Sequence, residues 1–298
     1  MTNGTGASGD PRSRQAEAAR SSAGSARRWR DLGPRTASAV VLIAIALTSL
    51  WRGGTPFALF WLAAAIGLLW EWQRLIGGSR LLARVLVGAA SVAVATYFAK
   101  RASLEPALFA LGVGVAAAAA IAQSGRRMWS GAGVLYAGAL VMAVCVLRFS
   151  VLDGALAVGW LFAVVWGADV MAYFGGRLIG GPKLWPRASP SKTWAGLLVG
   201  VSFGALLGAL ILEVHHAPLG EGAALALGAL TGIVSQAGDL FESFMKRWFR
   251  TKDSSGLIPG HGGLMDRLDG FLAATTFAAI LGIARAGVAA AGLGLFRW

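Results

Sequence analysis

The polar segment between residues 246 and 269 combines basic and acidic side chains at close spacing. Four basic residues fall within seven positions, and three aspartates follow them; the basic residues are Lys246, Arg247, Arg250 and Lys252, and the aspartates are Asp253, Asp266 and Asp269. Carboxylates bind Mg²⁺, and lysine and arginine bind phosphate oxygens, so the combination suits a phosphorylated substrate. Basic residues beside a membrane also attract anionic lipid, but that alternative leaves the paired aspartates unexplained.

The middle of this segment predicts a loop. Residues 259–263 read Pro-Gly-His-Gly-Gly, which favours irregular backbone whose N–H groups can approach a ligand. Asp266 and Asp269 are three residues apart where the next apolar run begins, so both can point to one side of a helix. His261 could be an acid–base group, a phosphate donor or a turn residue.

A second polar gap, residues 177–192, has the same character. It contains four basic residues, and its end together with the next residue reads Ser-Pro-Ser-Lys-Thr, which includes Ser189, Lys192 and Thr193. This sequence is also typical of a helix N-terminus, with Ser189 as the cap and Pro190 in the first helical position. The two interpretations are compatible, because helix N-termini bind phosphate.

Two acidic residues lie inside apolar runs, Asp169 and Asp239. A charge within a bilayer span costs at least about 2.5–3.5 kcal/mol, so such residues are functional candidates. Asp239 shares one helix face with Ser235, Glu242 and Lys246, at spacings of four, three and four residues. A structural polar seam, with Asp239 pairing to Lys246, is the alternative interpretation of this face. Most other acidic residues fall at span ends, where a charge costs little; these are Asp31, Glu71, Glu105, Asp153, Glu213 and Glu221.

The elements that must position these side chains are membrane-spanning helices. Hydrophobic residues make up 56% of the 298 and charged residues only 14%, against about 25% in an average soluble domain. A bilayer crossing needs about 20 apolar residues. We predict an all-α polytopic membrane bundle of about nine transmembrane helices, at residues 36–51, 55–73, 81–99, 104–122, 132–148, 155–175, 193–213, 221–245 and 269–291.

Three regions follow from this division. Residues 1–35 are rich in Gly, Ser, Ala and Arg and predict a disordered basic cytoplasmic tail. Residues 36–150 form the N-terminal transmembrane helices, and residues 151–298 form the C-terminal catalytic region. The only cysteine, Cys145, lies in an apolar run and is expected to be a packing residue.

Charge fixes the expected topology. With the N-terminus inside, 21 of the 27 Lys and Arg residues fall on the inner side, as the positive-inside rule requires. Both polar gaps then face the cytoplasm, and the C-terminus faces outside. The net charge of +13 does not indicate nucleic-acid binding, because the basic residues form no continuous surface.

The run from Ser243 to Asp269 resembles the pattern of the phosphatidate cytidylyltransferase family, in the form S-x-x-K-R-x4-K-D-x-S-x2-I-P-x-H-G-G-x-x-D-R-x-D. Shorter blocks agree, at Asp169 to Gly175, at Ser189 to Trp194 and at Ser235 to Leu240, so that the resemblance covers about residues 160–272. The sequence departs from the family pattern at two positions in or next to the block that begins at Ser189. Ser191 replaces a lysine and Ala195 a glutamate, which leaves Lys192 with more of the phosphate contact.

The resemblance implies the reaction CTP + phosphatidic acid → CDP-diacylglycerol + pyrophosphate, in phospholipid biosynthesis. It implies Mg²⁺, with room for a second cation, held by Asp239 and Asp266 and less strongly by Asp269. Lys246, Arg247 and Lys252 would bind triphosphate or the lipid head group, with Lys246 and Lys252 counted among the catalytic residues. The remaining substrate-binding candidates are Ser189, Lys192, Thr193, His261 and Arg267.

Other features of the protein follow from the same resemblance or stay open. The expected location is the bacterial inner membrane, with membrane lipid as a partner and the active site toward the cytoplasm. The sequence leaves open whether the chain forms a homodimer, which acyl chains it prefers and which residues read the cytosine base.

Two other functions compete with this one. A transporter or flippase could use Asp169 and Asp239, but it predicts paired broken helices in two related halves, and no internal repeat is evident. A related lipid-phosphate transferase could use another nucleotide or a polyprenyl phosphate.

Overall fold

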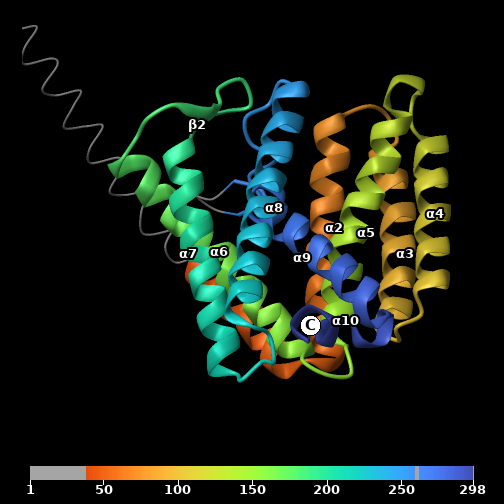
Figure 1. Ribbon diagram of the computed structural model, residues 1–298. Coiled ribbons are helices and arrows are strands. Elements are labelled where there is room, and N and C mark those ends of the chain that lie inside the picture. Colours follow the sequence, from red (N-terminus) through yellow and green to blue (C-terminus); the bar gives the residue numbers. More distant parts are fainter. Residues whose placement is uncertain (1–37, 259–261, 298) are drawn as a thin grey trace, which may run out of the picture.

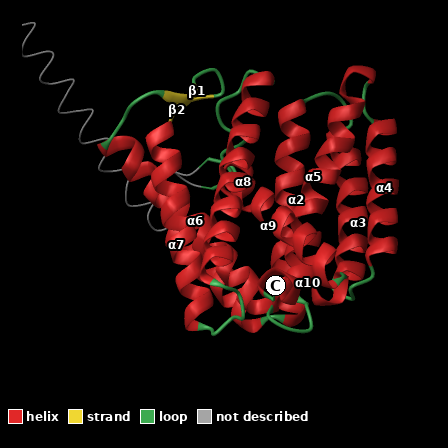
Figure 2. Cartoon of the chain, in the orientation of Figure 1, coloured by secondary structure: helices red, strands yellow, loops and turns green. Residues whose placement is uncertain are grey.

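Long α-helices make up nearly all of the computed structural model, which describes residues 38–258 and 262–297 (Figures 1 and 2). Within these residues, eight helices are long and apolar enough to cross a membrane. They are α2 (Gly54–Ile76), α3 (Leu81–Ala99), α4 (Leu104–Ile121), α5 (Arg127–Arg148), α6 (Gly154–Leu178), α7 (Trp194–Val214), α8 (Glu221–Trp248) and α9 (Met265–Ala286). The prediction of a polytopic helical membrane protein is confirmed.

The first and last spans differ from those expected from the sequence. The first expected span is a shorter apolar helix, Ser38–Arg52, whose length of about 22 Å is less than the hydrocarbon core of a bilayer. The last expected span, 269–291, is interrupted, because α9 ends before Gly287, whose φ of 79° favours glycine. The short helices η2 (Val288–Ala290) and α10 (Ala291–Phe296) follow. The predicted tail, residues 1–35, lies outside the described residues.

Successive helices run up and down, so the polar connections alternate between two ends. The connections α2–α3, α4–α5 and α6–α7 and the C-terminal end of α8 lie at one end of the bundle, and the C-terminus of the chain lies at the other (Figure 1). The two polar gaps of the sequence therefore face the same side, as expected. A short antiparallel hairpin, β1 (Lys183–Trp185) and β2 (Ser189–Thr193), occupies the α6–α7 connection.

The centre of the bundle is α5, whose spanning segment is 78% buried. It packs against α2, α3, α4, α6 and α9. Cys145 lies on α5 and is fully buried, which confirms its predicted packing role.

A glycine on every fourth residue lets α7 approach α6 closely. A Cβ atom added at Gly200 would lie 2.6 Å from the carbonyl oxygen of Ala168, and one at Gly204 would lie 2.8 Å from that of Val164. Small residues at this spacing allow backbones to pack in lipid, where apolar burial alone gives no driving force. The contact holds α6, which carries Asp169, beside the hairpin at the start of α7.

Substituting Gly200 by leucine should destabilise the protein by about 1–3 kcal/mol, because the added side chain has no space between α6 and α7. The apparent melting temperature in detergent measures this change. Gly112→Leu is the matched control, since no atom lies within 4 Å of a Cβ at Gly112 in α4. Equal melting temperatures for the two variants would contradict the role given to this contact.

Candidate active site

The N-terminal edge of α7 is built differently from the sequence-based expectation. Ser189 and Pro190 are not the cap and first residue of a helix, because both belong to strand β2, which pairs with β1. Thr193 caps the helix instead, and its Oγ1 accepts a hydrogen bond from the backbone N–H of Gly196 at 3.1 Å. A Ser-Pro sequence fits an edge strand as well as a helix start, so local sequence does not distinguish the two.

Lys192, at the end of this hairpin, is tied to α8 and through it to α6. Its Nζ lies 2.6 Å from Oδ2 of Asp239 and donates to Oε1 of Gln236 at 2.8 Å. The amide of Gln236 in turn donates to Oδ1 of Asp169 at 2.8 Å. Asp239 therefore pairs with Lys192 and not with Lys246, so the simple seam considered from the sequence is wrong. The two acidic residues within apolar runs belong to one polar network.

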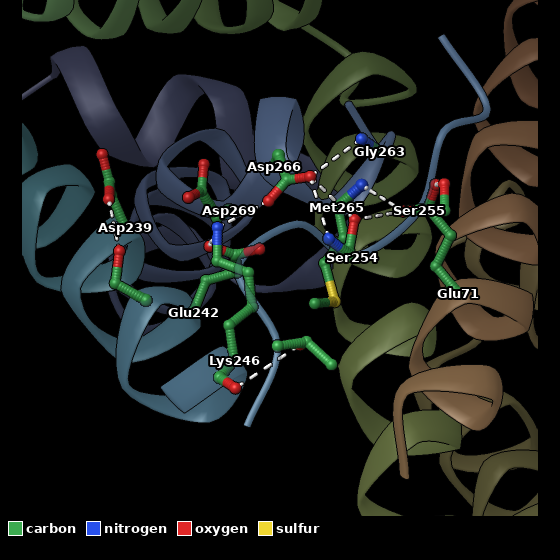
Figure 3. Close-up of polar contacts among 12 residues, drawn as sticks. Glu71, Asp239, Glu242, Lys246, Ser254, Ser255, Gly263, Met265, Asp266 and Asp269 are labelled. Carbon is green, nitrogen blue, oxygen red and sulfur yellow. Dashed lines mark hydrogen bonds and ion pairs between the residues drawn. The ribbon is translucent and has the colours of Figure 1, made fainter. Parts of the chain in front are cut away.

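The helices α8 and α9 meet at two glycines, which bring their carboxylates together. A Cβ at Gly238 would lie 2.7 Å from the carbonyl oxygen of Asp269, and one at Gly270 would lie 2.7 Å from Oγ of Ser235. Contact this close leaves room only for hydrogen side chains at both positions. Figure 3 shows the result, with Asp239, Asp266 and Asp269 beside one another.

Lys246 joins these two helices by charge. Its Nζ lies 2.6 Å from Oε2 of Glu242 on the same helix and 2.6 Å from Oδ1 of Asp266 on α9. The Glu242 side chain is only 2% exposed and that of Asp266 11%, so the ammonium group compensates two largely buried carboxylates. The cation expected to bind phosphate is thus engaged by protein carboxylates.

Asp266 itself is held on both oxygens. Its second oxygen, Oδ2, accepts hydrogen bonds from the backbone N–H of Gly263 at 2.8 Å and of Ser254 at 3.2 Å, and it lies 2.9 Å from the Ser254 hydroxyl. These donors come from the segment between α8 and α9, where Gly262 has a φ of 81°. The loop that the glycines predicted therefore turns its backbone N–H groups toward a carboxylate.

Glu71 differs from the expected inexpensive charge at the end of a span. It is fully buried near the end of α2, and its carboxylate accepts four hydrogen bonds from the same segment between α8 and α9. The donors lie almost 200 positions away in the chain, so only the tertiary fold brings them together. One signal was present, because Glu71 lies between two tryptophans inside a strongly apolar run.

A cavity of about 960 Å³ opens beside this network. Its polar lining residues, called the polar wall below, include Asp169, Lys192, Thr193, Asp239, Asp266, Arg267 and Asp269. Its apolar lining residues, called the apolar wall below, include Ile43, Trp61, Phe162, Trp166 and Phe271, with Ile43 contributed by the short helix Ser38–Arg52. The cavity thus offers both charged and apolar contacts.

The predicted site residues that the structure describes divide into two groups. Six of them line the cavity: Lys192, Thr193, Asp239, Asp266, Asp269 and Arg267. Ser189, Lys246, Arg247 and Lys252 are not part of its wall, and Arg247 and Lys252 are exposed at the end of α8 and beyond it. His261 lies outside the described residues. Ser191, the departure from the expected lysine, does line the cavity.

The chemistry of this wall fits Mg²⁺. Four carboxylates face the cavity, and hard oxygen donors are the ligands that this ion prefers. In the described part of the chain, no three His, Cys, Asp or Glu side chains form a complete metal cage. Mg²⁺ is usually held by one or two carboxylates together with substrate phosphates, so an incomplete protein cage is the expected form of such a site.

Comparison with known proteins agrees with these features. The model of the cytidylyltransferase family matches residues 34–284. A phosphatidate cytidylyltransferase of Brucella abortus biovar 1 (strain 9-941) is 40% identical over 257 residues, which cover 85% of this chain and 93% of that protein. One of Pseudomonas aeruginosa is 36% identical over 264 residues, covering 84% and 97%. One of Helicobacter pylori is 43% identical over 119 residues, covering 40% and 44%.

Proposed function

The chain belongs to the cytidylyltransferase family, and from that premise we propose how its residues carry out the reaction. It is a nucleotidyltransferase with the function of a phosphatidate cytidylyltransferase, as its relatives over most of its length indicate. It forms CDP-diacylglycerol and pyrophosphate from CTP and phosphatidic acid. The observation that carries this function, beside the family, is a cavity lined by both charged and apolar side chains.

The reaction brings two polyanions together. A phosphate oxygen of phosphatidic acid attacks the α-phosphorus of CTP, the new P–O bond forms, and the bond from the α-phosphorus to the bridging oxygen breaks as pyrophosphate leaves. Little covalent chemistry is required of the protein, so alignment and charge neutralisation supply most of the rate enhancement. We therefore assign no covalent nucleophile.

Charge neutralisation falls to the residues of the polar wall. Lys192 and Arg267 face the cavity and would contact phosphate oxygens of the substrates. Lys192 would exchange part of its 2.6 Å contact with Asp239 for a phosphate oxygen of the substrate. Arg247 and Lys252, exposed beside the site, remain proposed contacts of the triphosphate.

Asp239 and Asp266 are the proposed holders of Mg²⁺, with Asp269 beside them. When bound, the ion would neutralise phosphate charge as a Lewis acid. Lys246 holds one oxygen of Asp266, and the segment between α8 and α9 holds the other, so the orientation of this carboxylate is fixed before substrate arrives.

The apolar wall suits the acyl chains of phosphatidic acid. Trp61, Phe162 and Phe271 pack as neighbouring rings, with centroids 5.1 Å apart for the pairs Trp61–Phe271 and Phe162–Phe271. The lipid would enter from the membrane with its head group toward the aspartates. The bacterial origin of the relatives supports a position in a bacterial inner membrane. The excess of Lys and Arg in the connections at the site's end of the bundle supports a site that faces the cytoplasm. Whether two chains associate stays open.

The proposed reaction predicts that the purified protein in detergent converts labelled CTP to a CDP-lipid. Product should require both phosphatidic acid and Mg²⁺. Unlabelled CTP should compete with the labelled nucleotide, whereas ATP, GTP and UTP at the same concentration should not. Failure to form CDP-lipid under these conditions would contradict the proposed function. Equal competition by another nucleotide would instead indicate a related transferase.

A further inference from the structure

Glu71 is a buried carboxylate far in sequence from every residue assigned to the reaction. It lies near the end of α2, and its exposed fraction is 0%. None of the ion pairs among the described residues involves Glu71. A buried carboxylate without a cationic partner costs several kcal/mol unless hydrogen bonds replace its hydration. The hydrogen-bond donors around Glu71 must therefore compensate its burial.

Four donors meet this carboxylate, two at each of its oxygens. Oε1 accepts from the Ser255 hydroxyl at 2.5 Å and from the backbone N–H of Leu264 at 2.8 Å. Oε2 accepts from the backbone N–H of Met265 at 2.6 Å and lies 3.1 Å from the Ser254 hydroxyl. Leu264 and Met265 are the cap and the first residue of α9, where a helix carries partial positive charge.

These contacts fix both ends of the segment that holds Asp266. Ser254 and Ser255 lie at its start, and Leu264 and Met265 lie at its end, directly before Asp266 (Figure 3). The Ser254 hydroxyl lies between the two carboxylates, 3.1 Å from Oε2 of Glu71 and 2.9 Å from Oδ2 of Asp266. The hydroxyl has one proton, so it links the two acids by donating to one of them at a time.

The chain passes close to Glu71 at Gly263. A Cβ there would lie 2.9 Å from Oε1 and 2.8 Å from Oε2 of Glu71, and it would also overlap Oγ of Ser254. The N–H of Gly263 donates to Asp266 at 2.8 Å. The carboxylate of Glu71 is thus packed against the same backbone that orients the carboxylate of Asp266.

We propose that Glu71 is a positioning residue for the transfer reaction: it anchors Ser254 and Ser255 to Leu264 and Met265 and thereby sets the orientation of Asp266. The proposal rests on the proposed function, because it concerns the reaction assigned to that site. It gives the N-terminal helices a direct part in the site, since α2 supplies the anchor. Glu71 contacts no reacting atom and acts only through the segment.

Glu71→Gln and Glu71→Asp test this role. Glutamine keeps the shape but presents an NH₂ group to donors, so at least one contact becomes repulsive. We expect kcat to fall about 10²-fold, as a displacement of about 1 Å at a reacting group does. The Mg²⁺ concentration for half-maximal activity should rise about 10-fold or more, as on loss of a residue that supports a metal ligand. Glu71→Asp keeps the charge and should retain more activity than Glu71→Gln.

A second measurement does not depend on activity. Hydrogen–deuterium exchange of peptides covering 254–265 should quicken in Glu71→Gln and stay near wild type in peptides from α3 and α4. Glu105→Gln is the matched control, because Glu105 is an exposed glutamate in the first turn of α4. It should leave kcat, the Mg²⁺ requirement and the exchange rates unchanged.

The outcomes separate this proposal from others. A purely structural role would lower the melting temperature and the amount of folded protein, but it would leave the Mg²⁺ requirement of the folded fraction unchanged. That result, or unaltered exchange of 254–265, would overturn the proposal. Wild-type protein that forms no CDP-lipid would overturn the proposed function instead, and the exchange measurement would still report on the anchor.

Discussion

Asp266→Asn should lower kcat by about 10²–10³-fold, the loss typical when a group that stabilises developing charge is removed. The protein should stay folded and inserted in the membrane, because Lys246 keeps its ion pair with Glu242. The carboxylate has a different partner on each oxygen, Lys246 at 2.6 Å on Oδ1 and the N–H of Gly263 at 2.8 Å on Oδ2. An asparagine must place its NH₂ group against one of these donors. It also removes the charge that Mg²⁺ or the Lys246 ammonium would meet. Turnover of CTP by purified protein measures the effect.

The control for this substitution lies in the same segment. Asp253→Asn makes the same chemical change at an exposed position that is not part of the cavity wall. It should retain nearly full activity, because an exposed carboxylate that does not face the cavity contributes little. Gel filtration and the melting temperature establish that both variants are folded. Substantial turnover by folded Asp266→Asn protein would remove the role that we give this carboxylate.

Much of this site could be predicted because its signals are local. Asp266 and Asp269 stand at the start of an apolar run, and α9 does begin at Met265. Asp169 and Asp239 stand out because a charge inside a bilayer span is costly, and both line the cavity. Helical periodicity placed Glu242 and Lys246 on one face, and they do form an ion pair at 2.6 Å.

The parts that escaped prediction depend on contacts distant in sequence. Glu71 looked inexpensive near the end of a span, whereas its donors come from residues 254–265 after the chain has folded. The partner of Lys192 is Asp239 on α8, which no local pattern indicates. Strand β2 forms because Lys183 and Trp185 are available to pair with Thr193 and Ser189. Apolar periodicity fixes helices in a membrane, but it does not identify which polar groups meet between them.

The family resemblance and the structure imply different roles for Lys246. The family resemblance implies a phosphate contact for this residue, whereas its Nζ lies 2.6 Å from both Glu242 and Asp266. If the ammonium group is mainly a counter-charge for two carboxylates, its removal should affect folding as well as activity. If it mainly binds phosphate, its removal should affect activity alone.

The geometry favours the counter-charge, so Lys246→Met should lower both the melting temperature and kcat. Removing one partner from a buried ion pair costs about 3–5 kcal/mol, because the remaining charge has no compensation. Lys183→Met, at an exposed position of β1, is the matched control and should change the stability by less than about 0.5 kcal/mol. Adding Glu242→Gln to Lys246→Met removes one uncompensated carboxylate, so it should restore part of the lost stability without restoring turnover. An unchanged melting temperature together with a lower kcat for Lys246→Met would contradict the counter-charge role. Lys246 would then be assigned to phosphate binding, because a residue that compensates buried carboxylates cannot be removed without loss of stability.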